Sequence, residues 1–289
     1  TERLRKPEIC IDLWQKVRQY DPDQHDALAA LSGLYERARE WKPLADVLER
    51  QAERAANAEE QKAVLTKLGM IYADKLNDDH GAVSAFQRLL ALDPEDKRAQ
   101  EQLKRRYVAI KAWDDLEAFY APSGKFDELI RTFEREAGNK DAPKEEQIDL
   151  MFRVARLWQR QDKNDRAAKA YEKVLELDPK SFDAAVALSP IYESVNYSKK
   201  LAGVYEVRLE HVSDPGERIA LLRETGLLYE EKLKKPDLAF ARFLSALELD
   251  PSFERIATGA ERHARLCAVE ATRLGEWIAK LTRPTEAAA

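Results

Sequence analysis

The strongest constraint on this chain is an internal duplication. Adding 157 to each residue number from Asp21 to Pro94 gives the segment from Asp178 to Pro251 without a gap. Among the identities, Asp21, Pro22, Leu31, Tyr35, Gly69, Tyr72 and Phe86 return as Asp178, Pro179, Leu188, Tyr192, Gly226, Tyr229 and Phe243. Ungapped identity over such a length indicates that the chain is built by stacking copies of one structural element.

The segment 61–94 shows what that element is. Two apolar runs with helical spacing lie in it: the first is Leu65, Leu68, Gly69 and Tyr72, and the second is Ala82, Phe86, Leu89 and Leu90. Pro94 ends the second run, because proline cannot occupy a helix interior. Gly69 has no side chain and lets the second helix approach the first closely. The segment is therefore predicted to form a helical hairpin.

This hairpin resembles the tetratricopeptide repeat, a helix–turn–helix unit of about 34 residues. The family's small and large positions are matched by Leu65, Leu68, Gly69, Tyr72, Ala82, Phe86, Leu89 and Pro94. One residue too many lies between Tyr72 and Ala82, which predicts a longer first helix or a longer turn. The resemblance implies how the helices pack and leaves open what they bind.

The fold class predicted is all-α: a right-handed α-solenoid, or superhelix, of about seven antiparallel hairpins. They are expected near residues 24–56, 59–92, 95–138, 144–177, 181–212, 215–249 and 252–282, with a partial hairpin at 1–20. The whole of 1–289 is expected to be a single solenoid. Because the partial hairpin lacks its first helix, we expect a fragment of a longer protein; divergent terminal repeats that present a polar outer face are the alternative.

The middle copy departs from the other two. The interval from Asp93 to Asp178 is longer than that from Asp21 to Asp93, and two segments in it look like the start of a second helix. Pro122 and Gly124 interrupt the run between them. We expect a short extra helix at 113–120, followed by a longer one at about 125–137.

Charge and hydropathy narrow the function classes. The net charge of −5 argues against a general nucleic-acid binder, whose footprint would be basic. No uninterrupted apolar run is long enough for a membrane span. Cys10 and Cys267 lie near opposite ends and are expected to be free thiols, as in a reducing compartment. We therefore expect a cytoplasmic protein without membrane insertion; its oligomeric state stays open.

The sequence offers no pattern for catalysis. His25, His80, His211 and His263 are scattered without metal-ligand spacing, and no glycine-rich loop could cradle a phosphate. Acidic pairs such as Glu59-Glu60 suit helix N-termini. The aromatic residues at repeat positions, Trp158 among them, are expected in the core. We therefore predict that the protein is not an enzyme and that it holds no cofactor or metal.

A basic centre is the candidate binding site. In the family that the chain resembles, the first helices line a concave groove that commonly holds a peptide or a partner helix. The matching places here carry Arg98, Arg105, Arg156 and Arg160, with Arg153 alongside. One hypothesis is that these arginines accept an acidic peptide or a terminal carboxylate. The alternative is that they pair with nearby acids along their own helices.

Two classes of function remain. The first is a protein–protein interaction module, a scaffold or adaptor that binds a peptide or partner helix in the concave groove. The second is the regulatory or sensor region of a larger multidomain enzyme or signalling complex. The family's chaperone-binding variant uses a Lys/Asn/Arg clamp, whereas the matching places here hold Thr66, Met70, Phe152 and Arg156. A chaperone cofactor is therefore not expected.

Overall fold

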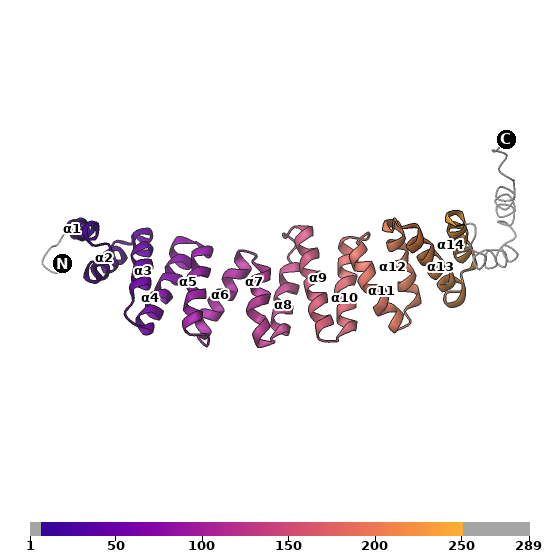
Figure 1. Ribbon diagram of the computed structural model, residues 1–289, viewed down its shortest axis with the longest axis horizontal. Helices are drawn as coiled ribbons and strands as arrows, with labels where there is room; N and C mark the ends of the chain where they lie inside the picture. The colour runs from indigo at the N-terminus through magenta and orange to yellow at the C-terminus, as the bar shows by residue number, and fades with distance from the viewer. Residues whose placement is uncertain (1–6, 251–289) are drawn as a thin grey trace, which may run out of the picture. The chain divides into compact units, whose positions relative to one another are not determined.

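The computed structural model describes residues 7–250, of which 7–125 belong to one compact unit (unit 1) and 126–250 to a second (unit 2). In unit 1 the helices are α1 (Pro7–Tyr20), α2 (His25–Ala38), α3 (Trp41–Arg54), α4 (Ala58–Ile71), η1 (Tyr72–Leu76), α5 (Asp79–Leu92), α6 (Lys97–Ala109), α7 (Trp113–Tyr120) and η2 (Ala121–Ser123). In unit 2 they are α8 (Phe126–Ala137), α9 (Lys144–Arg160), α10 (Asn164–Leu177), α11 (Phe182–Ser194), α12 (Ser198–His211), α13 (Pro215–Leu227), η3 (Leu228–Lys232) and α14 (Pro236–Leu249). Figure 1 labels the α-helices along the chain.

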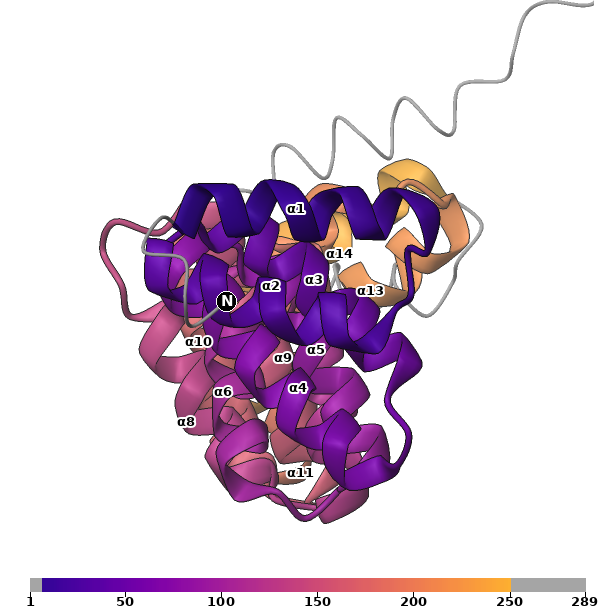
Figure 2. The ribbon, with the colours of Figure 1, turned by 90° about the vertical axis from the view of Figure 1, so that its left-hand side faces the viewer.

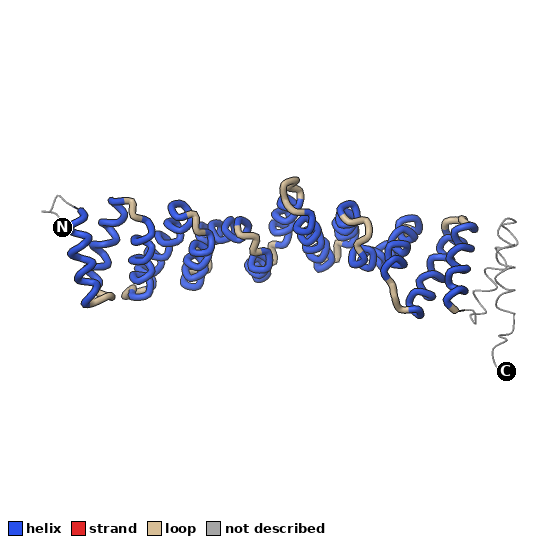
Figure 3. Tube along the Cα trace, turned by 90° about the horizontal axis from the view of Figure 1, so that it is seen from above, coloured by secondary structure: helices blue, strands red, loops and turns tan. Residues whose placement is uncertain are grey.

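Both units are stacks of helical hairpins. Throughout residues 7–250 the regular structure is helical (Figure 3). Within each unit, most helices pack against the helix that follows them in the sequence; at the N-terminal end, α1 packs alongside α2 (Figure 2). The prediction of an all-α fold of hairpins is confirmed. The handedness of the predicted superhelix stays a prediction, as does a single solenoid cut from a longer protein.

The predicted helix positions agree closely with those observed. The extra helix of the middle copy is α7, and the longer helix after it is α8. The partial hairpin near the N-terminus contributes α1 alone. The hairpin expected at 252–282 lies outside the described residues, as do His263 and Cys267.

Glycine lets the two helices of a hairpin approach at two equivalent points. A Cβ atom added to Gly69 would lie 2.7 Å from the ring of Phe86, and one added to Gly226 would lie 2.6 Å from the ring of Phe243. Both distances are shorter than a carbon–carbon contact allows. The close approach predicted at Gly69 is confirmed, and its partner is the phenylalanine ring on the second helix.

The turns show where the extra residue goes. In four hairpins the carbonyl of an aromatic residue accepts a hydrogen bond from the N–H five residues later; these residues are Tyr35, Tyr107, Trp158 and Tyr192. At Tyr72 and Tyr229 the donor comes six residues later, from Asp78 and Lys235, each at 2.9 Å. In these two hairpins the last turn is the π-helix η1 or η3. A π-turn accommodates one more residue than an α-turn, so of the two alternatives, a longer first helix or a longer turn, the longer first helix is the one observed.

Candidate functional site

The predicted arginines of unit 1 lie on α6. Arg98 and Arg105 are both exposed. The Nε atom of Arg105 lies 3.2 Å from a carboxylate oxygen of Glu101, one helical turn away. Hydrogen bonds from Lys104 and then Arg105 lower the pKa of Glu101, although burial opposes them. For Arg105, pairing with a local acid is thus observed, and an exposed pair of this kind contributes little to stability.

The predicted arginines of unit 2 lie on α9. The Arg153 side chain is only 16% exposed, and its Nε atom lies 2.8 Å from a carboxylate oxygen of Asp149. Arg156 and Arg160 are exposed, and neither makes an ion pair with a described residue. They lie four residues apart on one face of the helix. Of the five candidates, this pair is therefore the one that presents two guanidinium groups on one face of unit 2.

The tyrosines that face the preceding hairpin make a recurring hydrogen bond to it. Five of them hydrogen-bond through the hydroxyl to a side chain on the preceding hairpin's last helix: Tyr35 with Gln15 (2.7 Å), Tyr72 with Glu49 (3.5 Å), Tyr107 with Gln87 (2.8 Å), Tyr192 with Glu172 (2.7 Å) and Tyr229 with Glu206 (3.1 Å). Burial raises the pKa of Tyr229 to about 12, and the charge of Glu206 adds to the shift. Tyrosine at this position therefore joins successive hairpins.

In three places a basic side chain completes this contact. The glutamate that meets the tyrosine also pairs with a residue of the next second helix: Glu49 with Arg88 (2.6 Å), Glu172 with Lys200 (2.6 Å) and Glu206 with Arg242 (2.7 Å). We call this arrangement the three-helix link. It spans α3–η1–α5, α10–α11–α12 and α12–η3–α14, and in each case it covers the face of the middle helix.

The link is missing across α8, α9 and α10. Trp158 stands where the other first helices carry tyrosine, so no hydroxyl is available there. The Glu134 side chain, at the place of Glu49, makes no hydrogen bond or ion pair with a described residue. Lys173, at the place of Arg88, pairs instead with Glu176 at 2.6 Å. The face of α9 between α8 and α10 is therefore left uncovered.

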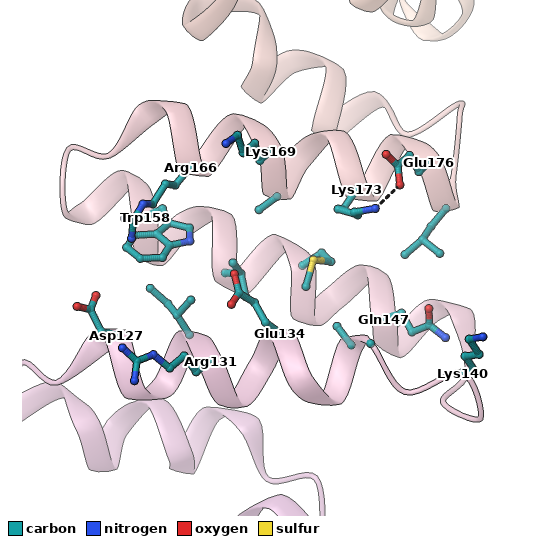
Figure 4. A pocket seen from close by; sticks show the side chains of 17 residues that line it. Asp127, Arg131, Glu134, Lys140, Gln147, Trp158, Arg166, Lys169, Lys173 and Glu176 are labelled. Carbon is teal, nitrogen blue, oxygen red and sulfur yellow. Dashed lines mark hydrogen bonds and ion pairs between the residues drawn. The ribbon is translucent and has the colours of Figure 1, made fainter.

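An open groove of about 820 Å³ occupies this uncovered face. We call it the α9 groove. Its floor is one face of α9, formed by Gln147, Met151, Val154 and Trp158. Figure 4 shows the side chains of α8 and α10 lining the two sides, with Arg131 and Glu134 from α8 and Lys169 and Lys173 from α10.

The charge of the groove differs from that of the chain. Its lining has five basic residues, Arg131, Lys140, Arg166, Lys169 and Lys173, and three acidic ones, Asp127, Glu134 and Glu176. The chain as a whole carries −5. At one end, Lys163 and Arg166 lie over the Trp158 ring at 4.8 and 4.6 Å from its centroid, within cation–π range. The groove is thus an apolar floor with a basic excess around it.

No cluster of three or more His, Cys, Asp and Glu side chains within residues 7–250 is placed to hold a metal ion. No helix in this range combines the length and apolar character that crossing a bilayer requires. His25, one of the scattered histidines, lies 3.4 Å from Glu60 on the surface.

Sequence reasoning missed the α9 groove. It placed Trp158 in the core, and the residue is indeed 7% exposed. The available signal was the change from tyrosine to tryptophan at one repeat position, which removes a hydroxyl group. That change has a meaning only once the tyrosine hydroxyls are seen to join successive hairpins.

Comparison with a model of the tetratricopeptide repeat gives matches at residues 63–96 and 149–181. The first contains α4, η1 and α5, and the second contains most of α9 and all of α10. None of the curated protein sequences compared with the chain matches it significantly.

Several solved structures are similar to the chain at low identity. A protein named MamA is 21% identical, covering 68% of this chain and 97% of its own, with a TM-score of 0.31. PilF of Pseudomonas aeruginosa is 14% identical, covering 82% and 95%, with a TM-score of 0.32. YrrB, described as having an unusual peptide-binding site, is 15% identical, covering 75% and 99%, with a TM-score of 0.31. Likenesses this weak say nothing about what this chain binds.

Proposed function

Because residues 63–96 and 149–181 are tetratricopeptide repeats, we propose that the chain is a non-catalytic module that binds another protein. Repeats of this kind stack into extended surfaces that serve as interaction platforms. The observation that supports the proposal most directly is the pair of exposed arginines on α9, Arg156 and Arg160, which have no acidic partner among the described residues.

The ligand proposed for this pair is an acidic peptide or a C-terminal carboxylate. A guanidinium group forms two parallel hydrogen bonds with a carboxylate, so two arginines one turn apart suit a pair of acidic groups. Arg153 is already engaged with Asp149 and would help to hold the face in place. In unit 1, Arg98 and Arg105 are proposed as a separate basic face on α6, weakened by the Arg105–Glu101 pair.

The test is peptide binding to the full chain with charge-reversed variants. An array of acidic peptides, with free and with amidated C-termini, would be screened, and binders measured by calorimetry. Replacing Arg156 and Arg160 with Glu is expected to weaken binding about ten-fold or more. Lys199→Glu, an exposed charge reversal on α12, is the matched control and should leave binding unchanged.

Two outcomes would contradict the proposal. One is binding of acidic peptides that the Arg156→Glu and Arg160→Glu variant retains in full. The other is an array without any acidic binder. A loss seen only with Arg98→Glu and Arg105→Glu would move the site to α6 in unit 1.

A further inference from the structure

We propose that the α9 groove is a docking site for an amphipathic helix of a partner protein, with acidic side chains along one edge of its apolar face. This site is separate from the arginine pair of the proposed function. Met151 and Trp158 form its floor, and Arg156 lies between them in sequence, about half a turn around α9 from that floor. The two surfaces can therefore be changed independently.

The shape of the groove suits a helix. Its floor runs along α9 from Gln147 to Trp158, which is about 16 Å or three turns at 1.5 Å per residue. The walls are two further helices, α8 and α10, on either side of that floor (Figure 4). A helix laid between them would pack against three helices at once, and its anchoring side chains would recur at i, i+4 and i+7.

The floor offers the apolar contacts that such anchors need. Val154 is buried beneath the groove, whereas Met151 is partly exposed at its centre. Methionine adapts its shape to different apolar partners, which suits a site that receives a side chain from outside. In the three places where the three-helix link is present, the equivalent space is spanned by a glutamate and a basic side chain. Here no described side chain spans it.

The charges specify which helix fits. Arg166, Lys169 and Lys173 follow one another along α10 at intervals of three and four residues, so they line one edge of the groove. On the opposite edge, Glu134 has no partner among the described residues. The complementary helix therefore carries Asp or Glu on the side that faces α10, and a Lys or Arg where it meets Glu134. This arrangement also sets the direction of the bound helix.

The experiment is a selection of displayed helical peptides against the full chain. The peptides would have about 14 residues, enough to cover the three turns of the floor. Apolar residues would be kept at i, i+4, i+7 and i+11, and the other positions randomised. The expected result is a pool enriched in Asp and Glu on one flank of the apolar face, with binding that weakens as salt is added.

Variants then locate the binding. Met151→Glu places a charge on the floor and should abolish binding of the selected peptides. Lys169→Glu with Lys173→Glu changes exposed residues only and should weaken binding about ten-fold or more while leaving the circular dichroism spectrum and the melting temperature unchanged. Arg156→Glu with Arg160→Glu, on the opposite face of the same helix, is the matched control and should bind the peptides normally.

Several results would overturn the proposal. Selected peptides that bind the Met151→Glu variant as well as the parent chain would place the site elsewhere. A pool without an acidic bias, or a selection without any binder, would remove the charge and shape argument. A dimer of the chain that light scattering shows to be dissociated by Met151→Glu would make a second copy the occupant instead. If the variant with Arg156→Glu and Arg160→Glu no longer binds the acidic peptides of the array but still binds the selected helices, both proposed sites are supported.

Discussion

In unit 1, α3, α4 and α5 cover the face that they share, whereas in unit 2 α8, α9 and α10 leave theirs open. Each set consists of the second helix of one hairpin, followed by the first and second helices of the next hairpin. In the closed set, Glu49 meets the Tyr72 hydroxyl and Arg88. In the open set, the glutamate is Glu134, and no described side chain meets it.

The difference comes from two local changes and not from a different fold. Tryptophan replaces tyrosine at residue 158, which removes the hydroxyl that would face Glu134. Glu176 pairs with Lys173, so this lysine is held on its own helix. A stack of repeats can thus acquire a recess through side-chain chemistry alone, while the backbone of the hairpin stays the same.

The largest expected difference between the two sets is in core packing. Phe86 is 1% exposed and lies against Gly69 in the closed set, so Phe86→Ala should cost about 3–5 kcal/mol of unfolding free energy. Met151 in the open set is only partly buried, and Met151→Ala should cost about 1 kcal/mol. Chemical denaturation, followed by hydrogen exchange of α4 and α9 peptides, measures both. Equal costs would show that the α9 face is as well packed as its counterpart.

A smaller effect on stability is expected when a side chain is added at Gly69, where the two helices approach closely. Gly69→Ala should lower stability by about 1 kcal/mol, because overpacking against Phe86 outweighs the better helix propensity of alanine. Gly33 in α2 is the matched control, since an added Cβ atom would meet nothing within 4 Å. Gly33→Ala should therefore raise stability by about 0.5–1 kcal/mol. Thermal melts of the two variants give the signs, and two stabilised variants would refute the close contact.

The three-helix link itself should contribute about 1 kcal/mol. Glu49 and Arg88 are about one-third exposed, which limits the strength of their ion pair. Glu49→Ala should lower the stability of unit 1 by this amount, whereas Glu134→Ala in unit 2 should change stability by less than about 0.5 kcal/mol. A double-mutant cycle with Arg88→Ala isolates the pair. A comparable loss from Glu134→Ala would mean that the groove is closed in solution.

The last expected difference is in how the stability of the fold depends on alkaline pH, which should involve Tyr229 but not Trp158. The Tyr229 hydroxyl, whose pKa is raised to about 12, stays protonated in the folded chain while an unfolded tyrosine ionises near its ordinary value of 10.0. Its contribution is fully present below pH 10 and is lost as the pH rises to about 12, because unfolding then releases a proton. Tyr229→Phe should flatten this part of the stability profile. Trp158→Phe, at the position without a hydroxyl, is the control and should leave the slope unchanged.

Much of the fold could be predicted because repeat positions report packing directly. The spacing of Leu65, Gly69 and Tyr72 predicted α4, and the interruption at Pro122 and Gly124 predicted two helices where the other copies have one. The extra residue after Tyr72 predicted a longer first helix or a longer turn, and the pattern specified neither which of the two nor a π-turn. These features depend on residues that are close in the sequence, or on a single packing contact at each repeat position, so the sequence pattern is enough to predict them.

The candidate site was harder to predict because it depends on contacts that fail to form. Arg105 and Arg153 carry an acid four residues before them, so the sequence allows their ion pairs to be expected as an alternative to ligand binding. The α9 groove, by contrast, requires knowing that residues on α8 and α10 could meet across α9 and do not. Trp158 is one of several aromatic residues expected in the core, and from the sequence alone nothing indicates that the contact between α8 and α10 is absent there.

The π-turns have a consequence for how copies can be exchanged. Because the additional residue is absorbed within the end of the first helix, the following helix keeps its contact between Phe86 and Gly69, as Phe243 does with Gly226. The shorter copy, with α9 and α10, makes its turn back to Trp158 one residue sooner. The additional residue thus leaves the contact between the two helices of a hairpin intact, and the same repeat pattern accommodates hairpins of two lengths.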